Sequence, residues 1–244
     1  MIRLNKKYYE KSAGENPLLG RLVVLVIVLM FFCCFDCQAA ALSPIAIAKR
    51  LQATYDRTTS MSAKFHQIAF ISMNRRKREA EGSVIILKPG RIRWDYSAPD
   101  RQVLVGDAKK ILMYFAKANQ MIVRPISDYL QSDVTYAFFT GSGNILRDFD
   151  VSAPDEQVQR STTAGNDKNK KDYCIKLVPR DTHPQVDFIH LWVDPDSFQI
   201  TRLKIVDQFG SVTDLFFSDI KLNPKVPIDT FSFTPPPGTE IIRE

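Results

Sequence analysis

The chain has 244 residues, of which 45% are apolar and 25% are charged, and it carries a formal net charge of +6. This composition is typical of a globular protein with enough apolar material for one sizeable core, which argues against a disordered or fibrous chain. The charge is too mild to indicate a nucleic-acid partner.

The first 41 residues have the pattern of a signal peptide. Five Lys/Arg precede the apolar run 22–35, and the small residues Ala39 and Ala41 follow it. The run is short against the roughly 20 residues that a membrane-spanning helix needs. We therefore expect cleavage after Ala41, export to the periplasm and a single domain over residues 42–244; an uncleaved membrane anchor is the alternative.

Cysteine usage agrees with a soluble exported product. Cys33, Cys34 and Cys37 lie in the targeting segment, so only Cys174 remains after cleavage and no internal disulfide can form. None of the first three follows the small residue that usually marks a bacterial lipoprotein processing site.

The mature chain begins with a helix and continues with strands. Ser43 and Pro44 start a helix that runs to about Arg57, with apolar residues at three- and four-residue spacing on one face. Period-two patterns then predict ten strands. These strands span 63–72, 82–88, 92–96, 102–105, 111–115, 120–124, 173–178, 187–193, 199–207 and 212–222.

Short turns rich in Gly, Pro and Asp join most of these strands, which predicts an antiparallel meander. Ten strands in about 200 residues are too many for a flat open sheet, so we expect strong curvature into a barrel or partial barrel.

Two segments interrupt the strands. Residues 152–171 are polar and are expected to form a mobile loop. Residues 132–144 contain Phe138 and Phe139 and stop at Gly141 and Gly143, which favours a short helix or lid over the sheet.

The densest basic cluster is Arg75-Arg76-Lys77-Arg78, between two strand-like runs. We interpret it as a solvated hairpin loop, and contact with nucleic acid or anionic lipid is the alternative.

Motifs for chemistry are scarce. The sequence lacks the metal-site, nucleophile-elbow and phosphate-loop spacings, and His66 and His190 sit in strand patterns that favour hydrogen-bonded structural histidines. We expect no catalysis, metal or cofactor, although scattered carboxylates can converge without a sequence signal.

The stretch RIRWDY (91–96) alternates charged and large apolar residues. In a strand, Arg91, Arg93 and Asp95 share a wet face, while Ile92, Trp94 and Tyr96 share an apolar face. That apolar face can belong to an ordinary packed core or to a ligand site.

A resemblance to a known family, carried by four stretches, favours the ligand site over an ordinary packed core. MSAKFHQ (61–67), LKPGRIRW (87–94), VLVGDAKKILMY (103–114) and FSFTPPPG (231–238) occur in this order behind a signal peptide. In this arrangement the chain resembles the LolA family of periplasmic outer-membrane lipoprotein carriers.

The resemblance implies a mainly β fold with helices: an incomplete, strongly curved antiparallel β-barrel with an α-helical lid enclosing an apolar cavity. It implies a monomeric carrier that takes triacylated lipoproteins from the inner-membrane ABC exporter LolCDE to the outer-membrane receptor LolB or an equivalent. A carrier or sensor of another envelope lipid, or a lipid-processing enzyme, are the alternatives. The cavity or lid residues expected to bind lipid are Phe65, Ile86, Ile92, Trp94, Tyr96, Val105, Met113, Phe115, Phe138 and Phe139.

Two positions depart from the family pattern. Lys88 stands where the family has an arginine before the proline of the turn, and lysine lacks the planar fork with which arginine holds several lid groups. Lys88 is therefore the candidate for a lid latch, and a solvated lysine at the end of a strand is the alternative. Ala108 replaces the usual glycine after Asp107, so that turn is expected to differ in type.

Overall fold

The computed structural model describes residues 42–107, 109–126, 143–158, 172–181, 183 and 185–243. The chain divides into two units between Ala41 and Leu42, and the description below concerns the second unit alone. Phe138, Phe139, Ala108 and most of the two interrupting segments lie outside the described residues. Within the described ranges, no helix is both long and apolar enough to cross a membrane.

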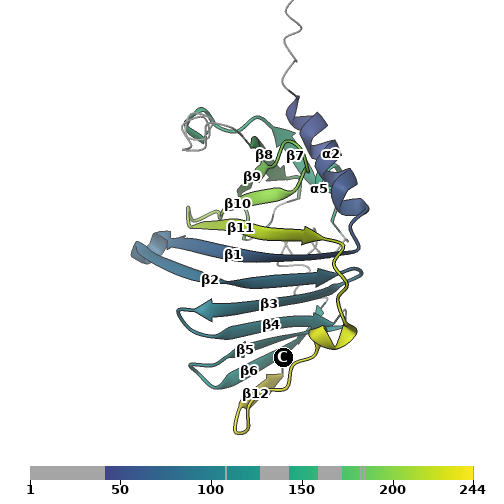
Figure 1. Cartoon of the computed structure of the whole chain (residues 1–244). Coiled ribbons are helices and arrows are strands. Elements are labelled where there is room, and N and C mark those ends of the chain that lie inside the picture. The colour runs from purple at the N-terminus through teal and green to yellow at the C-terminus, as the bar shows by residue number, and fades with distance from the viewer. Residues whose placement is uncertain are drawn as a thin grey trace, which may run out of the picture. The chain divides into compact units, whose positions relative to one another are not determined.

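The described residues form one sheet whose strands lie in the order β12-β6-β5-β4-β3-β2-β1-β11-β10-β9-β8-β7 (Figure 1). All neighbours are antiparallel except β12 and β6, which are parallel. The strands are β1 Ser60–Ile71, β2 Arg76–Leu87, β3 Arg91–Ala98, β4 Gln102–Asp107, β5 Lys110–Phe115, β6 Gln120–Pro125, β7 Phe149–Ser152, β8 Tyr173–Pro179, β9 Phe188–Val193, β10 Ile200–Val206, β11 Val212–Leu222 and β12 Glu240–Arg243.

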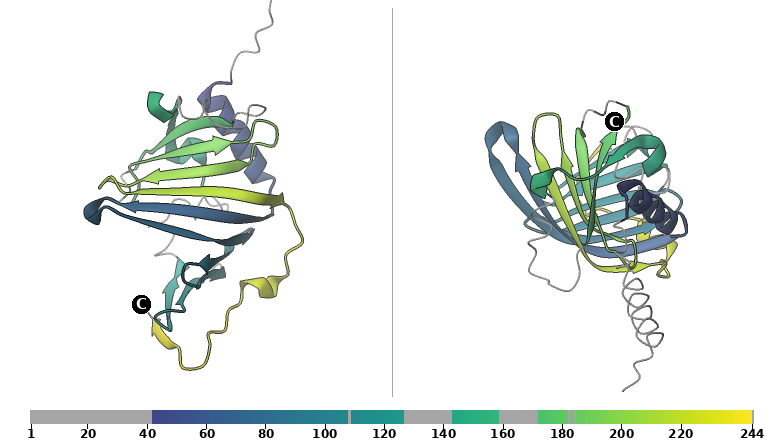
Figure 2. Two further views of the ribbon diagram at one scale, coloured as in Figure 1. Left: turned by 60° about the vertical axis from the view of Figure 1, so that its left-hand side comes forward. Right: turned by 90° about the horizontal axis from the view of Figure 1, so that it is seen from above.

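The sheet curves strongly but does not close (Figure 2). Its edge strands β7 and β12 are not paired with each other, so the barrel is incomplete. The predicted fold class, a mainly β, strongly curved and open antiparallel barrel with helices, is confirmed.

All ten predicted strands are present, and β7 and β12 are additional. β2 begins at Arg76, so the expected charged loop is wrong in part: the turn spans 72–75, and Arg76, Lys77 and Arg78 continue the strand. Polar exposed residues can extend a hairpin because both strands still pair through their backbones, as Ile71 and Arg76 do.

Two helices accompany the sheet. α2, Pro44–Asp56, is capped by Ser43, whose Oγ accepts a hydrogen bond from the Ala46 amide at 3.2 Å. The short α5, Ile145–Asp148, is tied to α2 because the Ile145 amide donates to Gln52 Oε1 at 2.9 Å in a buried contact. Both helices pack near β7, and α2 also contacts β8.

One face of the sheet, here called the inner face, packs against α2. Alternate residues of every central strand contribute to it. Around α2 it is densely filled by the buried side chains Ile47, Leu51, Tyr55, Phe149, Ile175, Leu177, Ile189, Leu191, Val193, Leu203 and Leu215.

The opposite, outer face of β2–β6 is covered by the segment after β11, which we call the C-terminal strap (residues 223–239). Its 3₁₀ helix η2, Ile228–Phe231, contacts β3 and β4. Phe231 is buried there with Val103, Val105, Tyr114 and Met121. The strap therefore gives this part of the sheet a second small core.

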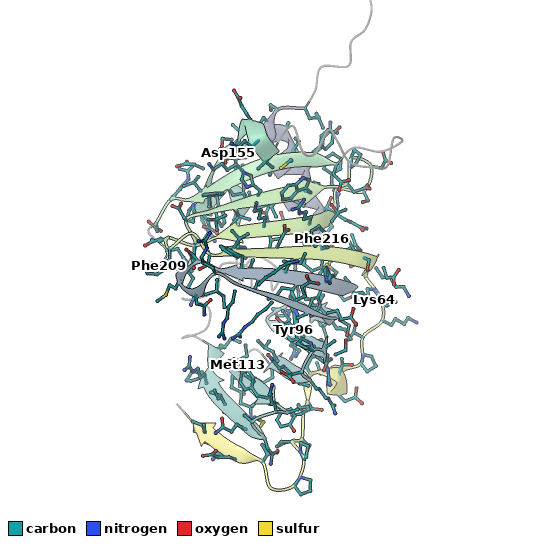
Figure 3. All side chains as sticks on the ribbon, turned by 90° about the vertical axis from the view of Figure 1, so that its left-hand side faces the viewer. Lys64, Tyr96, Met113, Asp155, Phe209 and Phe216 are labelled. Atoms are coloured by element: carbon teal, nitrogen blue, oxygen red, sulfur yellow. The ribbon has the colours of Figure 1, made fainter. Side chains whose placement is uncertain are left out.

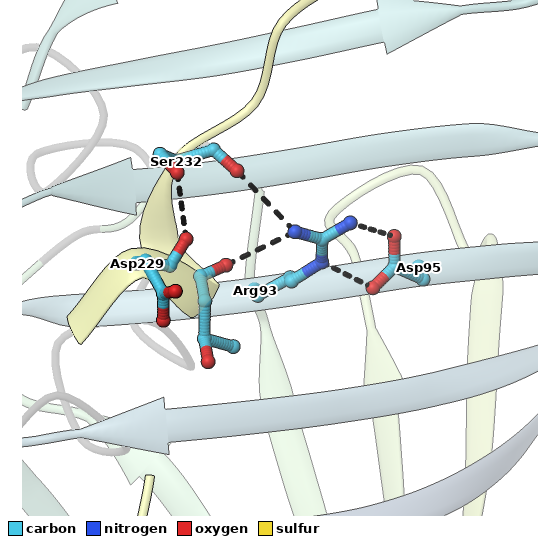
Figure 4. A network of polar contacts seen from close by, with 5 residues as sticks. Arg93, Asp95, Asp229 and Ser232 are labelled. Carbon is cyan, nitrogen blue, oxygen red and sulfur yellow. Dashed lines mark hydrogen bonds and ion pairs between the residues drawn. The ribbon is translucent and has the colours of Figure 1, made fainter. Parts of the chain in front are cut away.

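Arg93 fastens the strap to the sheet (Figure 4). Its guanidinium donates to the Asp95 carboxylate at 2.6 and 3.2 Å and to the backbone carbonyls of Thr230 and Ser232 at 3.0 and 3.4 Å. Arg93 and Asp95 do share a face, as predicted, but that face is not simply wet, because the strap lies over it.

We predict that Phe231→Ala lowers the free energy of unfolding by about 3 kcal/mol, because it removes a buried aromatic ring from the strap core. Urea unfolding followed by circular dichroism measures the change. Ile228→Ala is the control within the same short helix: Ile228 is 61% exposed, and its truncation should change stability by less than about 0.5 kcal/mol. Equal effects of the two substitutions would contradict the assignment of Phe231 as the strap's anchor.

Candidate functional site

The inner face of β1–β6 carries a continuous apolar row. The strand register aligns Ala63 with Val84, Val84 with Trp94, Trp94 with Leu104, Leu104 with Met113 and Met113 with Ile122. Residues paired across neighbouring strands point to the same side, so this row crosses six strands on one face. Such a row is a long apolar surface built by the sheet itself.

A second row is aromatic. Phe217 pairs with Phe65, Phe65 with Gly82, and Gly82 with Tyr96. The ring of Phe65 lies 5.0 Å from that of Tyr96 in an edge-on arrangement and 4.9 Å from that of Trp94. These distances are those of favourable aromatic pairs.

Gly82 makes this arrangement possible. A Cβ atom at this position would lie 1.9 Å from the Asp95 carbonyl oxygen and 3.0 Å from the Phe65 ring. Because glycine has no side chain, the rings of Phe65 and Tyr96 meet across β2.

The structure brings most of the expected lipid-binding residues together. Phe65, Ile86 and Ile92 are buried on the inner face, and Trp94, Tyr96, Met113 and Phe115 are partly buried in the same rows. Leu104, Ile122 and Phe217 belong to these rows but were not predicted as site residues. The alternation of their strands indicated that these residues lie on one face, but no sequence motif singled them out as site residues.

Val105 does not lie with this group. It is 1% exposed on the outer face, in the core under the strap. The prediction for Val105 is corrected because Val103, Leu104 and Val105 are all apolar, so alternation alone does not decide which of them faces inward.

The apolar surface contains few polar atoms. The Tyr96 hydroxyl donates to Gln67 Oε1 at 3.1 Å. The indole N–H of Trp94 is buried and has no hydrogen-bond partner among the described residues. An unpaired buried donor typically costs about 1–3 kcal/mol, so its presence on this face calls for a physical reason.

Lys88 connects the turn after β2 to the end of α2. Its Nζ donates to the Tyr55 carbonyl oxygen in the last turn of the helix, where a cation also meets the negative end of the helix dipole. Burial lowers the pKa of Lys88, and the nearby Asp56 carboxylate opposes this shift.

Tyr55 itself is anchored deep in the inner core. Its hydroxyl accepts a hydrogen bond from the Ile200 amide at 3.4 Å and lies 3.9 Å from Met61 Sδ. Burial raises the pKa of the Tyr55 hydroxyl. Lys88 therefore links the β2–β3 turn to a helix that packs on the other half of the sheet, which consists of strands β7–β11.

Comparison with known proteins agrees with this architecture. Residues 56–234 match the family model described as "Outer membrane lipoprotein carrier protein LolA". The chain belongs to the LolA family. Among its curated relatives, the outer-membrane lipoprotein carrier protein of Methylobacillus flagellatus is 29% identical over 194 residues, covering 80% of this chain and 87% of that protein.

Two further comparisons place this LolA-family chain. The outer-membrane lipoprotein carrier protein of Nitrosomonas europaea is 28% identical over 196 residues, covering 80% of this chain and 88% of the relative. An uncharacterized conserved protein from Thermus thermophilus shares the fold, with a TM-score of 0.51 and 12% identity, covering 81% of this chain and 99% of its own.

A hollow of about 840 Å³ lies beside the aromatic row of this LolA-family sheet. Its lining includes the charged residues Lys64, Glu81, Asp95 and Arg101 together with His66. Charged groups lose hydration when apolar groups cover them. This hollow therefore suits polar, solvated contacts, and the inner-face rows are the better candidate for an apolar ligand.

His190 is an unusual buried residue on the outer face of the other half. It is 2% exposed and lies between the rings of Phe188 and Trp192, at 5.2 and 6.1 Å. Neither ring nitrogen has a hydrogen-bond partner among the described residues. His190 is therefore a structural histidine, as expected, but the expected hydrogen bond is not formed with the described residues. Its Nε2 lies 3.4 Å from Asp155 Oδ2.

Burial, and after it the charged neighbours, set the titration of this histidine. Burial lowers the pKa of His190, the Asp155 carboxylate opposes the shift, and Lys176, Lys204 and Arg202 reinforce it. The hydrogen bond from Lys176 to Asp155, 2.9 Å long, lowers the pKa of that carboxyl. Asp155 therefore stays ionised throughout the range in which a histidine titrates.

We predict that stability falls as pH decreases from about 7 to 5, with a slope of at most about 1.4 kcal/mol per pH unit from this one proton. The folded-state pKa of His190 lies below its unfolded value of about 6.5, so the unfolded chain binds the proton first as pH falls. Urea unfolding at several pH values measures the slope. His190→Gln should flatten it relative to the wild type, and an identical slope in both proteins would contradict the prediction.

Proposed function

We propose that the protein is a periplasmic chaperone that binds the acyl chains of lipoproteins on its inner face and carries them from the inner to the outer membrane. Its activity is binding without catalysis. In this role it receives triacylated lipoproteins from an exporter of the LolCDE type and delivers them to LolB or an equivalent receptor.

The observation that carries the proposal is the apolar row from Ala63 to Ile122 across six strands of a curved sheet. Each acyl methylene exposed to water costs roughly 0.8 kcal/mol, so a triacylated protein needs cover in an aqueous compartment. A curved apolar face with partly buried side chains such as Trp94 and Leu104 supplies such cover.

The indole N–H of Trp94 fits this proposal. It lies within the apolar row, buried and without a partner among the described residues. An ester carbonyl at the head of an acyl chain is an acceptor, and a hydrogen bond to it would satisfy the donor. A purely hydrocarbon ligand would leave this donor unsatisfied.

The compartment follows from the first 41 residues, which we propose are a cleaved signal peptide. A short apolar run behind five Lys/Arg and before Ala39 and Ala41 supports export. Curated relatives named outer-membrane lipoprotein carrier proteins cover most of the chain, in agreement with a place between two membranes.

We predict that Met113→Glu strongly reduces lipoprotein binding, because it puts an ionised group into the apolar row. The measurement is native mass spectrometry of protein purified from a periplasm that contains a triacylated lipoprotein. A drop of at least about tenfold in the bound fraction is expected for a cost above about 1.4 kcal/mol.

Lys110→Glu is the matched control on the same strand. Lys110 is exposed and does not share the face of Met113, and its reversal changes the net charge more than Met113→Glu does. Binding should survive this substitution, and thermal unfolding of both variants separates lost binding from lost folding. Equal losses would reject the inner face as the site, and bound glycolipid in the wild type would favour a carrier of another envelope lipid.

The Lys88 contact is proposed to act as a latch between the two halves of the inner face. We predict that Lys88→Leu increases access of a hydrophobic dye to the empty protein, since it removes the donor to the Tyr55 carbonyl. Loss of a bond of about 1 kcal/mol shifts an open–closed equilibrium roughly fivefold. Lys88→Arg, which keeps a donor, should bind no more dye than the wild type. Indistinguishable dye binding in all three proteins would leave Lys88 without a latch role.

A further inference from the structure

Two turns lie side by side at one end of the sheet and form what we call the tip. The first is the β1–β2 turn, residues 72–75, and the second is the β10–β11 turn, residues 208–210. The Ser72 amide donates to Oγ of Ser211, the residue directly after the second turn, at 3.2 Å, so the two turns are neighbours. The β1–β2 hairpin projects beyond the neighbouring strands, and the β10–β11 turn lies at the same end of the sheet (Figures 1 and 2).

Large apolar side chains are exposed at the tip. Met73 is 88% exposed, Phe209 is 71% exposed, and Phe70 in the adjoining strand is 39% exposed. Phe209 lies at the end of the sheet away from Lys64 (Figure 3). Exposed apolar residues on two neighbouring turns indicate a contact site more strongly than single scattered ones do.

The β10–β11 turn holds Phe209 in a fixed backbone conformation. Asp207 Oδ1 accepts hydrogen bonds from the amides of Phe209 and Ser211 at 2.9 and 2.7 Å. Its carbonyl oxygen accepts another from the Gly210 amide at 3.0 Å. Phe209 is therefore exposed on a turn whose backbone is held by hydrogen bonds. The Asp207 carboxylate is engaged by backbone amides of the same turn.

Basic side chains flank the apolar ones. Arg75, Arg76 and Arg78 are exposed and have no carboxylate partner among the described residues. Lys77, in contrast, is paired with Glu79 at 2.6 Å. The tip thus combines exposed apolar groups with unpaired guanidinium groups over a small area.

We propose that the tip docks the protein on an anionic lipid bilayer. Met73 and Phe209 enter the interfacial region, while Arg75, Arg76 and Arg78 contact lipid phosphates. Exposed apolar side chains beside exposed arginines match the two layers of a bilayer surface, because the apolar groups suit its interfacial region and the guanidinium groups suit its anionic phosphates. This inference goes beyond the proposed carrier function and does not depend on what the inner face binds.

The test is flotation of the purified, processed protein with vesicles of phosphatidylglycerol and phosphatidylethanolamine, compared with vesicles of phosphatidylcholine alone. Binding is expected on the anionic vesicles only and should weaken at ~0.5 M salt, because salt screens exposed charges. The vesicles contain no lipoprotein, so this result is separable from the test of the carrier function.

Two tip variants probe the two contributions. Met73→Ser with Phe209→Ser should weaken vesicle binding roughly tenfold by removing the apolar contact. Arg75→Gln with Arg76→Gln and Arg78→Gln should weaken it at least as much and remove the salt dependence. The matched control is Ile228→Ser with Ile241→Ser, which alters exposed apolar residues in the C-terminal region and should bind like the wild type.

A spectroscopic readout locates the contact. Tryptophan fluorescence of Phe209→Trp should shift to shorter wavelength on anionic vesicles and be quenched by lipids brominated in their acyl chains, beyond the response of the wild type. The proposal is overturned if the wild type fails to bind anionic vesicles, if the tip variants bind as well as the control, or if the introduced tryptophan is not quenched.

Discussion

The structure depends on how one strongly curved sheet covers its two apolar faces. Inward residues of β7–β11 are packed under α2, with side chains such as Ile175 and Val193 fully buried. On the outer side of β2–β6 the C-terminal strap covers the apolar residues, and its Phe231 is buried among them. The inward residues Trp94, Leu104 and Tyr96 are only partly buried, so part of the inner face of β3–β4 is less completely covered than that of β7–β11. That difference is what a binding protein needs, because a fully collapsed core would have no space for a ligand.

The contact between Lys88 and the Tyr55 carbonyl crosses these two halves. Tyr55 is buried in the half that α2 covers, whereas Lys88 belongs to the turn between β2 and β3. A single hydrogen bond contributes about 1 kcal/mol, which is enough to bias an equilibrium and too little to lock it. Lysine makes a point contact there, while an arginine fork can engage several acceptors. Lys88 therefore joins the two halves through one point contact at the Tyr55 carbonyl.

Much of this architecture could be predicted from the alternation of residues. RIRWDY placed Ile92, Trp94 and Tyr96 on one face correctly, because charged and apolar residues alternate there without ambiguity. Val105 was misplaced since its strand is apolar on both faces. Arg93 reads as solvent-facing, yet it binds carbonyls of Thr230 and Ser232, more than 130 residues away in the sequence. β7 and β12 were missed because four-residue strands carry little periodic signal, and long-range cover of this kind leaves no local pattern.

The direction of β2 relates the proposed membrane contact to the proposed latch. The strand begins at Arg76, beside the tip, and ends at Leu87, next to Lys88. Twelve residues at about 3.3 Å each separate the two by roughly 40 Å. A bilayer touching the tip would therefore not reach the end of α2 or its contact with Lys88. Because the two features occupy opposite ends of the same strand, attachment to a membrane and opening of the inner face do not compete for surface, and each can be altered by substitution without touching the other.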